Sequence, residues 1–207
     1  FDVSNGTVTE LTTTDAANYN ITITPAGNGL VTLSLANASV MDVFGNENAV
    51  SDQIEVKFDN ERPQVSMTST AAPTINAPFE VTVTFTEDVN GFEQSNVTVA
   101  NGTVTTFETL NTKQFKATIA PATDGEVLVS VAENVAQDVA TNGNEASASL
   151  SRVYDATKPT VVLATTAAEK VNAAFTVTAT FSENVTGFEV GDITVSNATL
   201  GNFTATS

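Results

Sequence analysis

The sequence contains an internal repeat with a period of 96 residues. Its clearest copies are two short segments, Phe58–Val65 and Tyr154–Val161. Both read aromatic, Asp, two variable residues, a cation, Pro, a polar residue and Val. Proline fixes its own φ and pushes the residue before it towards an extended backbone. Each segment is therefore predicted to be a stiff connector between two domains, and the period points to a tandem array.

The same offset of 96 residues aligns the rest of the chain. Residues 1–62 match 97–158, and residues 159–207 match 63–111. We therefore expect the C-terminal part of one repeat at 1–62, a complete repeat at 63–158 and the N-terminal half of a third repeat at 159–207. Because a partial sandwich cannot close its core, we expect the chain to be a section of a longer array.

Within the complete repeat, apolar and polar residues alternate with a period of two. For example, Val81, Val83 and Phe85 alternate with Thr82 and Thr84. Alternating runs that are rich in β-branched residues and bounded by Gly, Asn, Pro or Asp indicate strands. The expected strands are 64–69, 79–86, 96–100, 103–108, 113–120, 125–132 and 146–154. Seven short strands in ~100 residues predict an all-β fold, with immunoglobulin-like sandwiches arranged end to end.

Composition and charge remove several classes of function. The chain has 24 acidic and 7 basic residues and a net charge of −17, so its surface repels phosphate backbones and no nucleic-acid partner is expected. It has no Cys and no His, which removes thiol nucleophiles, imidazole bases and most zinc sites. The paired acids Glu87 and Asp88 have no aromatic platform or neighbouring base in the pattern, so we expect no enzyme. No apolar run approaches the ~20 residues of a membrane span, so no membrane insertion is expected in this segment.

Oxygen-bearing side chains are predicted to converge at one end of the complete repeat. In a seven-strand sandwich, the entering chain and the loops after the second and sixth strands lie at the same end. Here these segments carry Asp59, then Glu87, then Asp138, Asn142 and Asn144. Calcium takes six to eight oxygen ligands in a flexible geometry. The pattern therefore predicts a Ca²⁺ ion at the junction, held by these five residues.

The same ligand positions recur in the other copies. Asp155 and Glu183 would serve the next junction, and Asp42 and Asn46 are the counterparts in the first repeat. Two carboxylates ~4 Å apart repel by about 4 kcal/mol at an effective dielectric constant near 20, so a bound cation would hold the junction together. Asp and Asn before Gly are also ordinary turn formers, and a purely structural role for these residues stays open.

Two further features allow two interpretations each. Phe92 and Phe188 follow a Val-x-Gly motif; we expect them to plug one end of the sandwich, with an exposed ligand anchor as the alternative. Arg152 occupies the position of Val56 in the preceding copy. Its side chain could snorkel along the sheet, or the strand could bulge.

Several of these segments together resemble the bacterial Ig-like repeats of large secreted and cell-surface adhesins. The resemblance rests on Phe85–Phe92, Asn96–Thr103, the Gly-Asn loop and the Asp-x-x-x-Pro junction, and it covers essentially all 207 residues. It implies a non-catalytic stalk or extender outside the cell or on the bacterial surface, often with calcium at the junctions. The implied partners are neighbouring repeats of the same chain and, in a fibre, other copies. A carbohydrate- or protein-binding module, or an accessory domain of a secreted enzyme, remains an alternative.

Overall fold

The computed structural model describes residues 1–204. The chain forms two compact units, the first from Phe1 to Asp155 and the second beginning at Ala156. The last three residues of the predicted third repeat, 205–207, lie outside the described residues. In the described part the chain is all-β apart from two short 3₁₀ turns, η1 (Gln94–Asn96) and η2 (Val190–Asp192). We find no helix there with the length and apolar character needed to cross a membrane.

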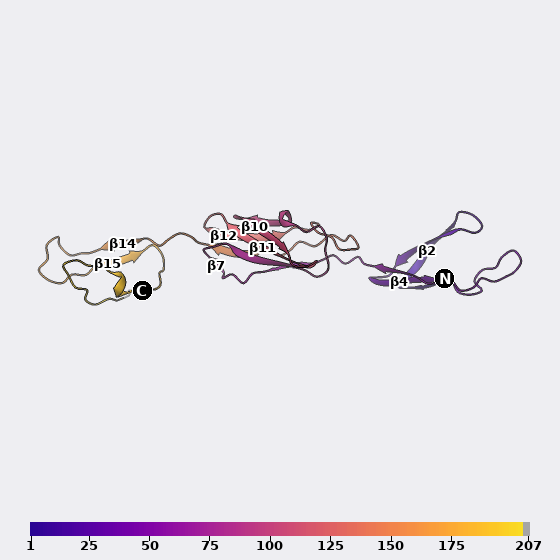
Figure 1. Cartoon of the computed structure of the whole chain (residues 1–207), viewed down its shortest axis with the longest axis horizontal. Coiled ribbons are helices and arrows are strands. Elements are labelled where there is room, and N and C mark those ends of the chain that lie inside the picture. Colours follow the sequence, from indigo (N-terminus) through magenta and orange to yellow (C-terminus); the bar gives the residue numbers. More distant parts are fainter. Residues whose placement is uncertain (205–207) are drawn as a thin grey trace. The chain divides into compact units, whose positions relative to one another are not determined.

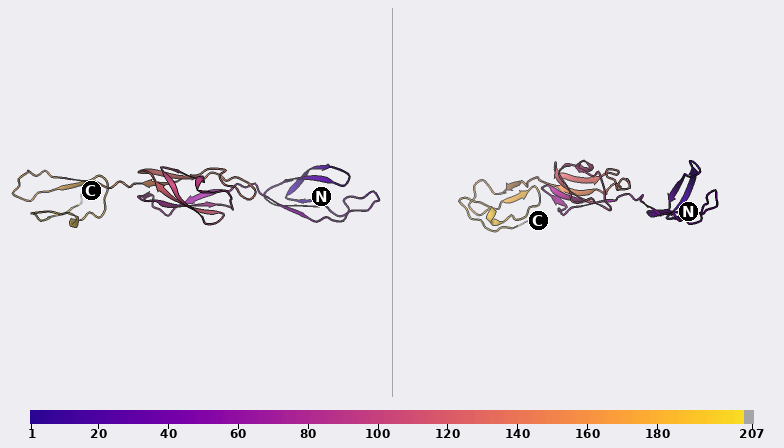
Figure 2. Two further views of the ribbon diagram at one scale, coloured as in Figure 1. Left: turned by 45° about the horizontal axis from the view of Figure 1, so that its top comes forward. Right: turned by 45° about the vertical axis from the view of Figure 1, so that its right-hand side comes forward.

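The central repeat is a sandwich of two four-stranded sheets (Figures 1 and 2). One sheet has the order β10-β11-β8-β6 and the other has the order β7-β13-β12-β9. Their strands are β6 (Val65–Thr68), β7 (Thr74–Ile75), β8 (Phe79–Phe85), β9 (Val97–Ala100), β10 (Gly102–Thr109), β11 (Gln114–Pro121), β12 (Gly125–Val131) and β13 (Leu150–Tyr154). The predicted immunoglobulin-like all-β fold is confirmed.

The alternation seen in the sequence produces the core of this sandwich. Val81, Val83 and Phe85 on β8 are buried, whereas Thr82 and Thr84 between them are only partly buried. β11 and β12 repeat the pattern and complete the core from both sheets. Burying such apolar side chains is the main favourable term in folding. The buried core residues are Phe79, Val81, Val83, Phe85, Val89, Phe92, Val97, Phe115, Ala117, Ile119, Val127, Val129, Val131 and Ala136.

The structure differs from the predicted strands at two places. The first predicted strand ends at Thr68, and the chain then crosses to the other sheet, where β7 runs parallel to β13. The hydroxyl of Ser69 accompanies this crossing and donates to the carbonyl of Glu80. The last predicted strand, 146–154, begins only at Leu150, because the residues before it belong to the loop described below.

The structure decides between the two interpretations of Phe92 and of Arg152. Phe92 is buried and makes edge-to-face contacts with the rings of Phe85 and Phe115, so the core interpretation is confirmed. β12 and β13 pair in an unbroken register through Arg152, so there is no bulge at this position. Its guanidinium instead reaches back to donate to the carbonyl of Ser69, while its buried Nε has no partner.

Residues 1–58 reproduce the second part of the central repeat. Three strands form one sheet in the order β1-β4-β5, and two more form a separate hairpin. The strands are β1 (Asp2–Ser4), β2 (Gly6–Thr13), β3 (Tyr19–Pro25), β4 (Gly29–Ser34) and β5 (Ile54–Phe58). Backbone details recur at the same offset of 96 residues. Asn5, Asn101 and Asn197 all adopt φ values between 51° and 59°.

The second unit begins with a hairpin of β14 (Val161–Ala164) and β15 (Thr178–Phe181). These strands are the counterparts of β6 and β8 in the central repeat. The ring of Phe188 packs edge-to-face against Phe181 and Phe203. Phe188 thus occupies the same kind of aromatic cluster as Phe92, although it is only partly buried.

Candidate metal centre at a repeat junction

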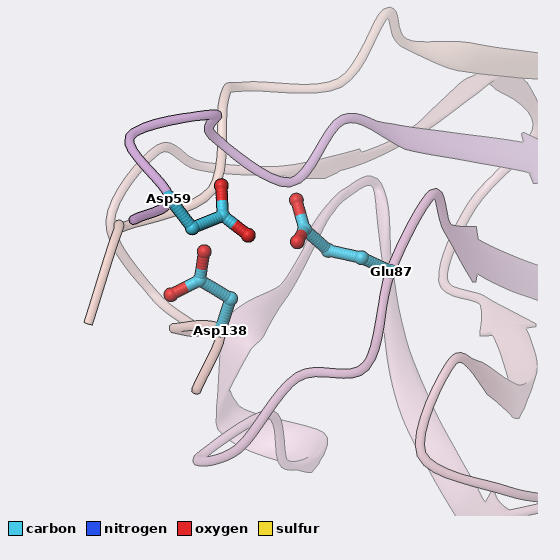
Figure 3. Close-up of side chains that lie close together, drawn as sticks. All are labelled: Asp59, Glu87 and Asp138. Carbon is cyan, nitrogen blue, oxygen red and sulfur yellow. The ribbon is translucent and has the colours of Figure 1, made fainter. Parts of the chain in front are cut away.

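Three carboxylates from distant parts of the chain meet at one end of the central repeat. Asp59 directly follows β5, Glu87 follows β8, and Asp138 lies in the loop between β12 and β13. One carboxylate oxygen from each lies within 4.8 Å of the other two. Figure 3 shows the three side chains pointing towards a common space. The structure thus brings together one acid from each of the three segments that the sequence singled out.

The loop that carries Asp138 is organised by a buried amide. Asn144 is completely buried. Its Oδ1 accepts hydrogen bonds from the backbone N–H groups of Val135 and Ala136, and its Nδ2 donates to the carbonyls of Ala132 and Glu145. Because both ends of the amide serve the loop backbone, Asn144 contributes by holding the loop in shape.

Asn142 connects two of the three acids. Its backbone N–H donates to Asp138 Oδ1 over 2.8 Å, and its Nδ2 donates to Asp138 Oδ2 over 2.8 Å. The same Nδ2 also donates to the backbone carbonyl of Asp59 over 3.0 Å. Gly143 is required next to it, since a Cβ there would lie 2.3 Å from Asn134 Oδ1. Asp138, itself only 5% exposed, is therefore fixed in orientation by its neighbour.

Arg62 fastens the junction to the same loop. Its Nε donates to the carbonyl of Gly143 over 2.8 Å. Its Nη2 donates to the carbonyl of Asn144 over 2.8 Å and to Asn134 Oδ1 over 2.9 Å. The buried Pro63 follows, and its carbonyl accepts the N–H of Glu145. Residues 59–63 are thus hydrogen-bonded to the loop independently of any ion.

Sequence reasoning did not assign this role to Arg62. The signal was present, because a cation precedes Pro at both junctions: Arg62 before Pro63 and Lys158 before Pro159. However, nothing in the pattern says that the guanidinium would contact backbone carbonyls about 80 positions downstream. Only the convergence of the two segments in the fold reveals it.

The cluster concentrates negative charge. The pKa of Glu87 is raised above its ordinary value of 4.5, first by burial and then by the charges of Asp138, Asp59 and Glu61. Lys113 opposes this effect weakly. Lys57 Nζ lies 3.8 Å from Asp59 Oδ2 but is largely exposed. Desolvation and like charge both disfavour the ionised form of Glu87, so a cation at this place would relieve both.

The donor set suits a hard divalent cation. Three carboxylates from three separate segments fit Ca²⁺, which accepts irregular shells completed by backbone carbonyls and water. Mg²⁺ demands a near-ideal octahedron and dehydrates reluctantly, so it suits this set less well. Among the described residues, Asp59, Glu87 and Asp138 form the one group of three acidic ligands with this spacing.

The remaining predicted ligands are placed as follows. Asp42 and Asn46 reproduce the loop geometry in the first repeat: Asn46 Nδ2 donates to Asp42 Oδ2 over 2.8 Å, and both residues are exposed. These hydrogen bonds, first from the Asn46 side chain, lower the pKa of Asp42. Asp155, whose N–H donates to the carbonyl of Ile75, ends the first unit. Glu183 follows β15 in the second unit, and a shared site for Asp155 and Glu183 stays a prediction.

The fold and the junction define a class of protein, a chain of tandem all-β sandwich repeats with an acidic cluster at a repeat boundary. The family model of the bacterial Ig-like domain matches the chain three times, at residues 1–58, 59–154 and 155–207. The chain therefore belongs to the bacterial Ig-like domain family and carries three tandem copies. No curated protein matches the chain.

Proposed function

We propose that this chain is a non-catalytic stalk segment of a bacterial surface protein, and that calcium stiffens the junction between its repeats. The observation that carries the proposal is the convergence of Asp59, Glu87 and Asp138 at the boundary between the first and second matched domains. Asp59 lies on the connector, while the other two acids belong to the body of the repeat. An ion held by all three would tie the connector to that body.

The rest of the junction supports a mechanical role. Arg62 and Asn142 already hydrogen-bond residues 59–63 to the loop 138–145, so the connector has a defined path before any ion binds. Calcium would supply one thing that these bonds do not, two positive charges that offset most of the negative charge of the three clustered carboxylates. Removing that repulsion would favour the joined arrangement and would make the stiffness of the chain depend on calcium.

The chemistry of the surface is consistent with an extender. Most large apolar side chains of the central repeat lie in its core or pack against it. The acidic surface, at a net charge of −17, keeps neighbouring chains soluble and apart. Members of a tandem array supply reach through repetition, since each repeat adds its own length. We place this stalk outside the cell or on the bacterial surface, with adjoining repeats as its first partners.

Calorimetric titration of the full chain with Ca²⁺, after treatment with a chelator, tests the metal. We expect binding in the affinity range of extracellular calcium modules, roughly 0.1–1 mM. Small-angle scattering of the same samples tests the stiffening, because a calcium-bound junction should narrow the distribution of chain dimensions. Asp52→Asn, which removes one negative charge from an exposed position in the first repeat, serves as the control. This variant should bind calcium as the parent chain does. Absence of binding in the parent chain would overturn the calcium proposal.

A further inference from the structure

A single peptide group between the first and the central repeat is hydrogen-bonded on both sides. Asn28, in the turn between β3 and β4, accepts the backbone N–H of Asn60 through its Oδ1 over 2.9 Å. Asn142 of the central repeat donates to the carbonyl of Asp59 over 3.0 Å. That carbonyl and that N–H belong to the same peptide group, and in a trans peptide they point in opposite directions. One planar group therefore bonds to a side-chain amide from each repeat.

The chain passes from one repeat to the other without a free residue. Phe58, the last residue of β5, pairs with Gly29 in the sheet of the first repeat. The shared peptide group follows, and Asp59 Oδ1 accepts the N–H of Glu61 over 3.1 Å. Arg62 is then bonded to the loop of the central repeat. Because each residue from 58 to 62 has a partner, the connector cannot bend without breaking at least one of these bonds.

The turn that carries Asn28 is held in place by a second asparagine. Asn5 Nδ2 donates to the carbonyl of Gly27 over 2.8 Å, and the carbonyl of Asn5 accepts the N–H of Ala26. Gly29, directly after Asn28, has a φ of +128°, a conformation that a side chain would strain. The side chain of Asn28 is therefore presented to the connector from a fixed backbone.

The complete repeat builds the same turn at the offset of 96 residues. Asn101 Nδ2 donates to the carbonyl of Thr123 over 2.8 Å, and Gly125 has a φ of +126°. The turn therefore forms in a closed sandwich as well as in residues 1–58. The counterpart of Asn28 in this turn is Asp124, whose side chain also carries oxygen atoms that can accept an N–H.

We propose that the Asp59–Asn60 peptide couples the first repeat to the central repeat, so that loosening it on one side weakens its hydrogen bond on the other side. Ordering this peptide costs conformational entropy. Once one repeat has ordered it, the other repeat binds it at a lower cost. A hydrogen bond at one end of a peptide group also polarises the group and strengthens the bond at the other end.

The coupling gives the tandem array a specific contact between neighbours. The stability of a repeat array depends on the intrinsic stability of each repeat and on terms between adjacent repeats. The bonds from Asn28 and Asn142 to one peptide group would supply such a term at this junction. The inference goes beyond the calcium proposal, because none of these bonds involves an ion.

Hydrogen exchange of individual backbone amides, followed by NMR on the full chain in chelator, tests the coupling. The informative probe is the N–H of Asn60, which bonds to Asn28 and not to Asn142. Asn28→Ala should speed its exchange directly. Asn142→Ala should speed the same exchange at least about fivefold, the lower end of typical coupling between sites. If Asn142→Ala leaves the exchange of Asn60 unchanged, the two repeats hold the peptide independently and the proposal is wrong.

Two further variants separate coupling from a general loss of stability. Asn28→Asp keeps an acceptor oxygen and should retain the slow exchange of Asn60 that Asn28→Ala loses. Val129→Ala truncates a side chain that is 0% exposed in the core of the central repeat, away from the connector, and should leave the exchange of Asn60 unchanged. If Val129→Ala and Asn142→Ala speed this exchange alike, the effect is a loss of stability and the proposed coupling is absent. Because all samples contain chelator, failure of calcium to bind would change none of these outcomes.

Discussion

The side-chain amide of Asn142 donates a hydrogen bond to the backbone carbonyl of Asp59 across 83 positions of sequence, at 3.0 Å. The same nitrogen donates to Asp138 Oδ2. One side chain therefore positions two members of the acidic cluster and joins the connector to the loop. The first repeat offers a natural comparison, since Asn46 makes the equivalent bond to Asp42 in an exposed loop.

Replacing this amide should weaken the junction. Asn142→Ala leaves Asp138 Oδ2, on a buried residue, and the Asp59 carbonyl without their donor. We expect a loss of about 1–3 kcal/mol in the free energy of unfolding of the central repeat. Asn46→Ala changes the equivalent exposed residue and should cost about 0.5 kcal/mol or less. Scanning calorimetry of the full chain measures both, and equal losses would show that the bond to Asp59 contributes nothing.

Even the substitution of Arg62 by lysine is expected to destabilise the protein. The planar guanidinium of Arg62 donates to the carbonyls of Gly143 and Asn144 and to Asn134 Oδ1, and it also forms an ion pair with Glu133. A lysine ammonium is a compact point charge on a flexible stem and cannot reproduce that fork. Arg62→Lys should therefore cost about 1.5–3 kcal/mol of stability, as for other hydrogen bonds to charged groups.

Lys57→Gln is the matched control for Arg62. Its ion pair with Asp59 is long, at 3.8 Å, and solvent-exposed on the lysine side. Exposed pairs of this kind contribute about 0–1 kcal/mol. Limited proteolysis of residues 59–63 gives a local readout beside calorimetry. If the two variants unfold and are cleaved alike, Arg62 does not fasten the junction.

The core could be predicted from the sequence because the alternation on β8, β11 and β12 leaves little choice of which side chains turn inward. The crossing of the first strand from one sheet to the other could not, because Pro73 marks a break in the strand but does not show which sheet the chain joins next. The loop before β13 was also mistaken for strand. There the hydroxyl of Ser147 accepts the backbone N–H of Val131, a side-chain contact that the alternating pattern does not reveal.

The candidate site shows the same division. The convergence of Asp59, Glu87 and Asp138 could be predicted from the topology. In a seven-strand sandwich the entering chain and the loops after the second and sixth strands lie at the same end. The division of labour between Asn142 and Asn144 could not be foreseen. Both are Asn residues two positions apart in one loop, and only their hydrogen bonds separate the one that faces the acids from the one that holds the loop backbone.

Truncation of a core aromatic provides a test of the packing itself. Phe85 is 2% exposed and contacts the rings of Phe92 and Phe115. Phe85→Ala should destabilise the central repeat by about 3–5 kcal/mol, through lost burial and the cavity left behind. Phe44→Ala, at an 88% exposed position, should stay within about 0.5 kcal/mol of the parent chain. Thermal unfolding measures the contrast, and similar melting of the two variants would contradict the observed core.

Calcium should stabilise the parent chain measurably. With a dissociation constant on the order of 0.1–1 mM, about 10 mM calcium adds about 1.4–2.7 kcal/mol to the free energy of unfolding by mass action. Asp59→Asn and Asp138→Asn should each remove most of this gain, whereas Asp52→Asn should keep it. The measurement is the calcium-dependent shift in melting temperature relative to chelator. Equal shifts in all three variants would place the ion elsewhere.

The pH dependence of stability should reveal Glu87 in the metal-free chain. Its pKa is raised in the folded state, first by burial and then by the neighbouring acids, so the folded chain binds this proton more readily than the unfolded chain. Stability attributable to Glu87 therefore increases as the pH falls from the raised folded pKa towards the ordinary value of 4.5, and is constant below it.

The Glu87→Gln variant isolates that effect because it cannot ionise. In chelator at neutral pH it should be more stable than the parent chain, and the difference should shrink as the pH approaches 4.5. In calcium the order should reverse at neutral pH, because the variant loses a ligand that the parent chain retains. Calorimetry of both chains at matched pH values, with and without calcium, measures the crossover. If the difference in stability between the two chains stays constant with pH in chelator, the pKa of Glu87 is not raised by the cluster.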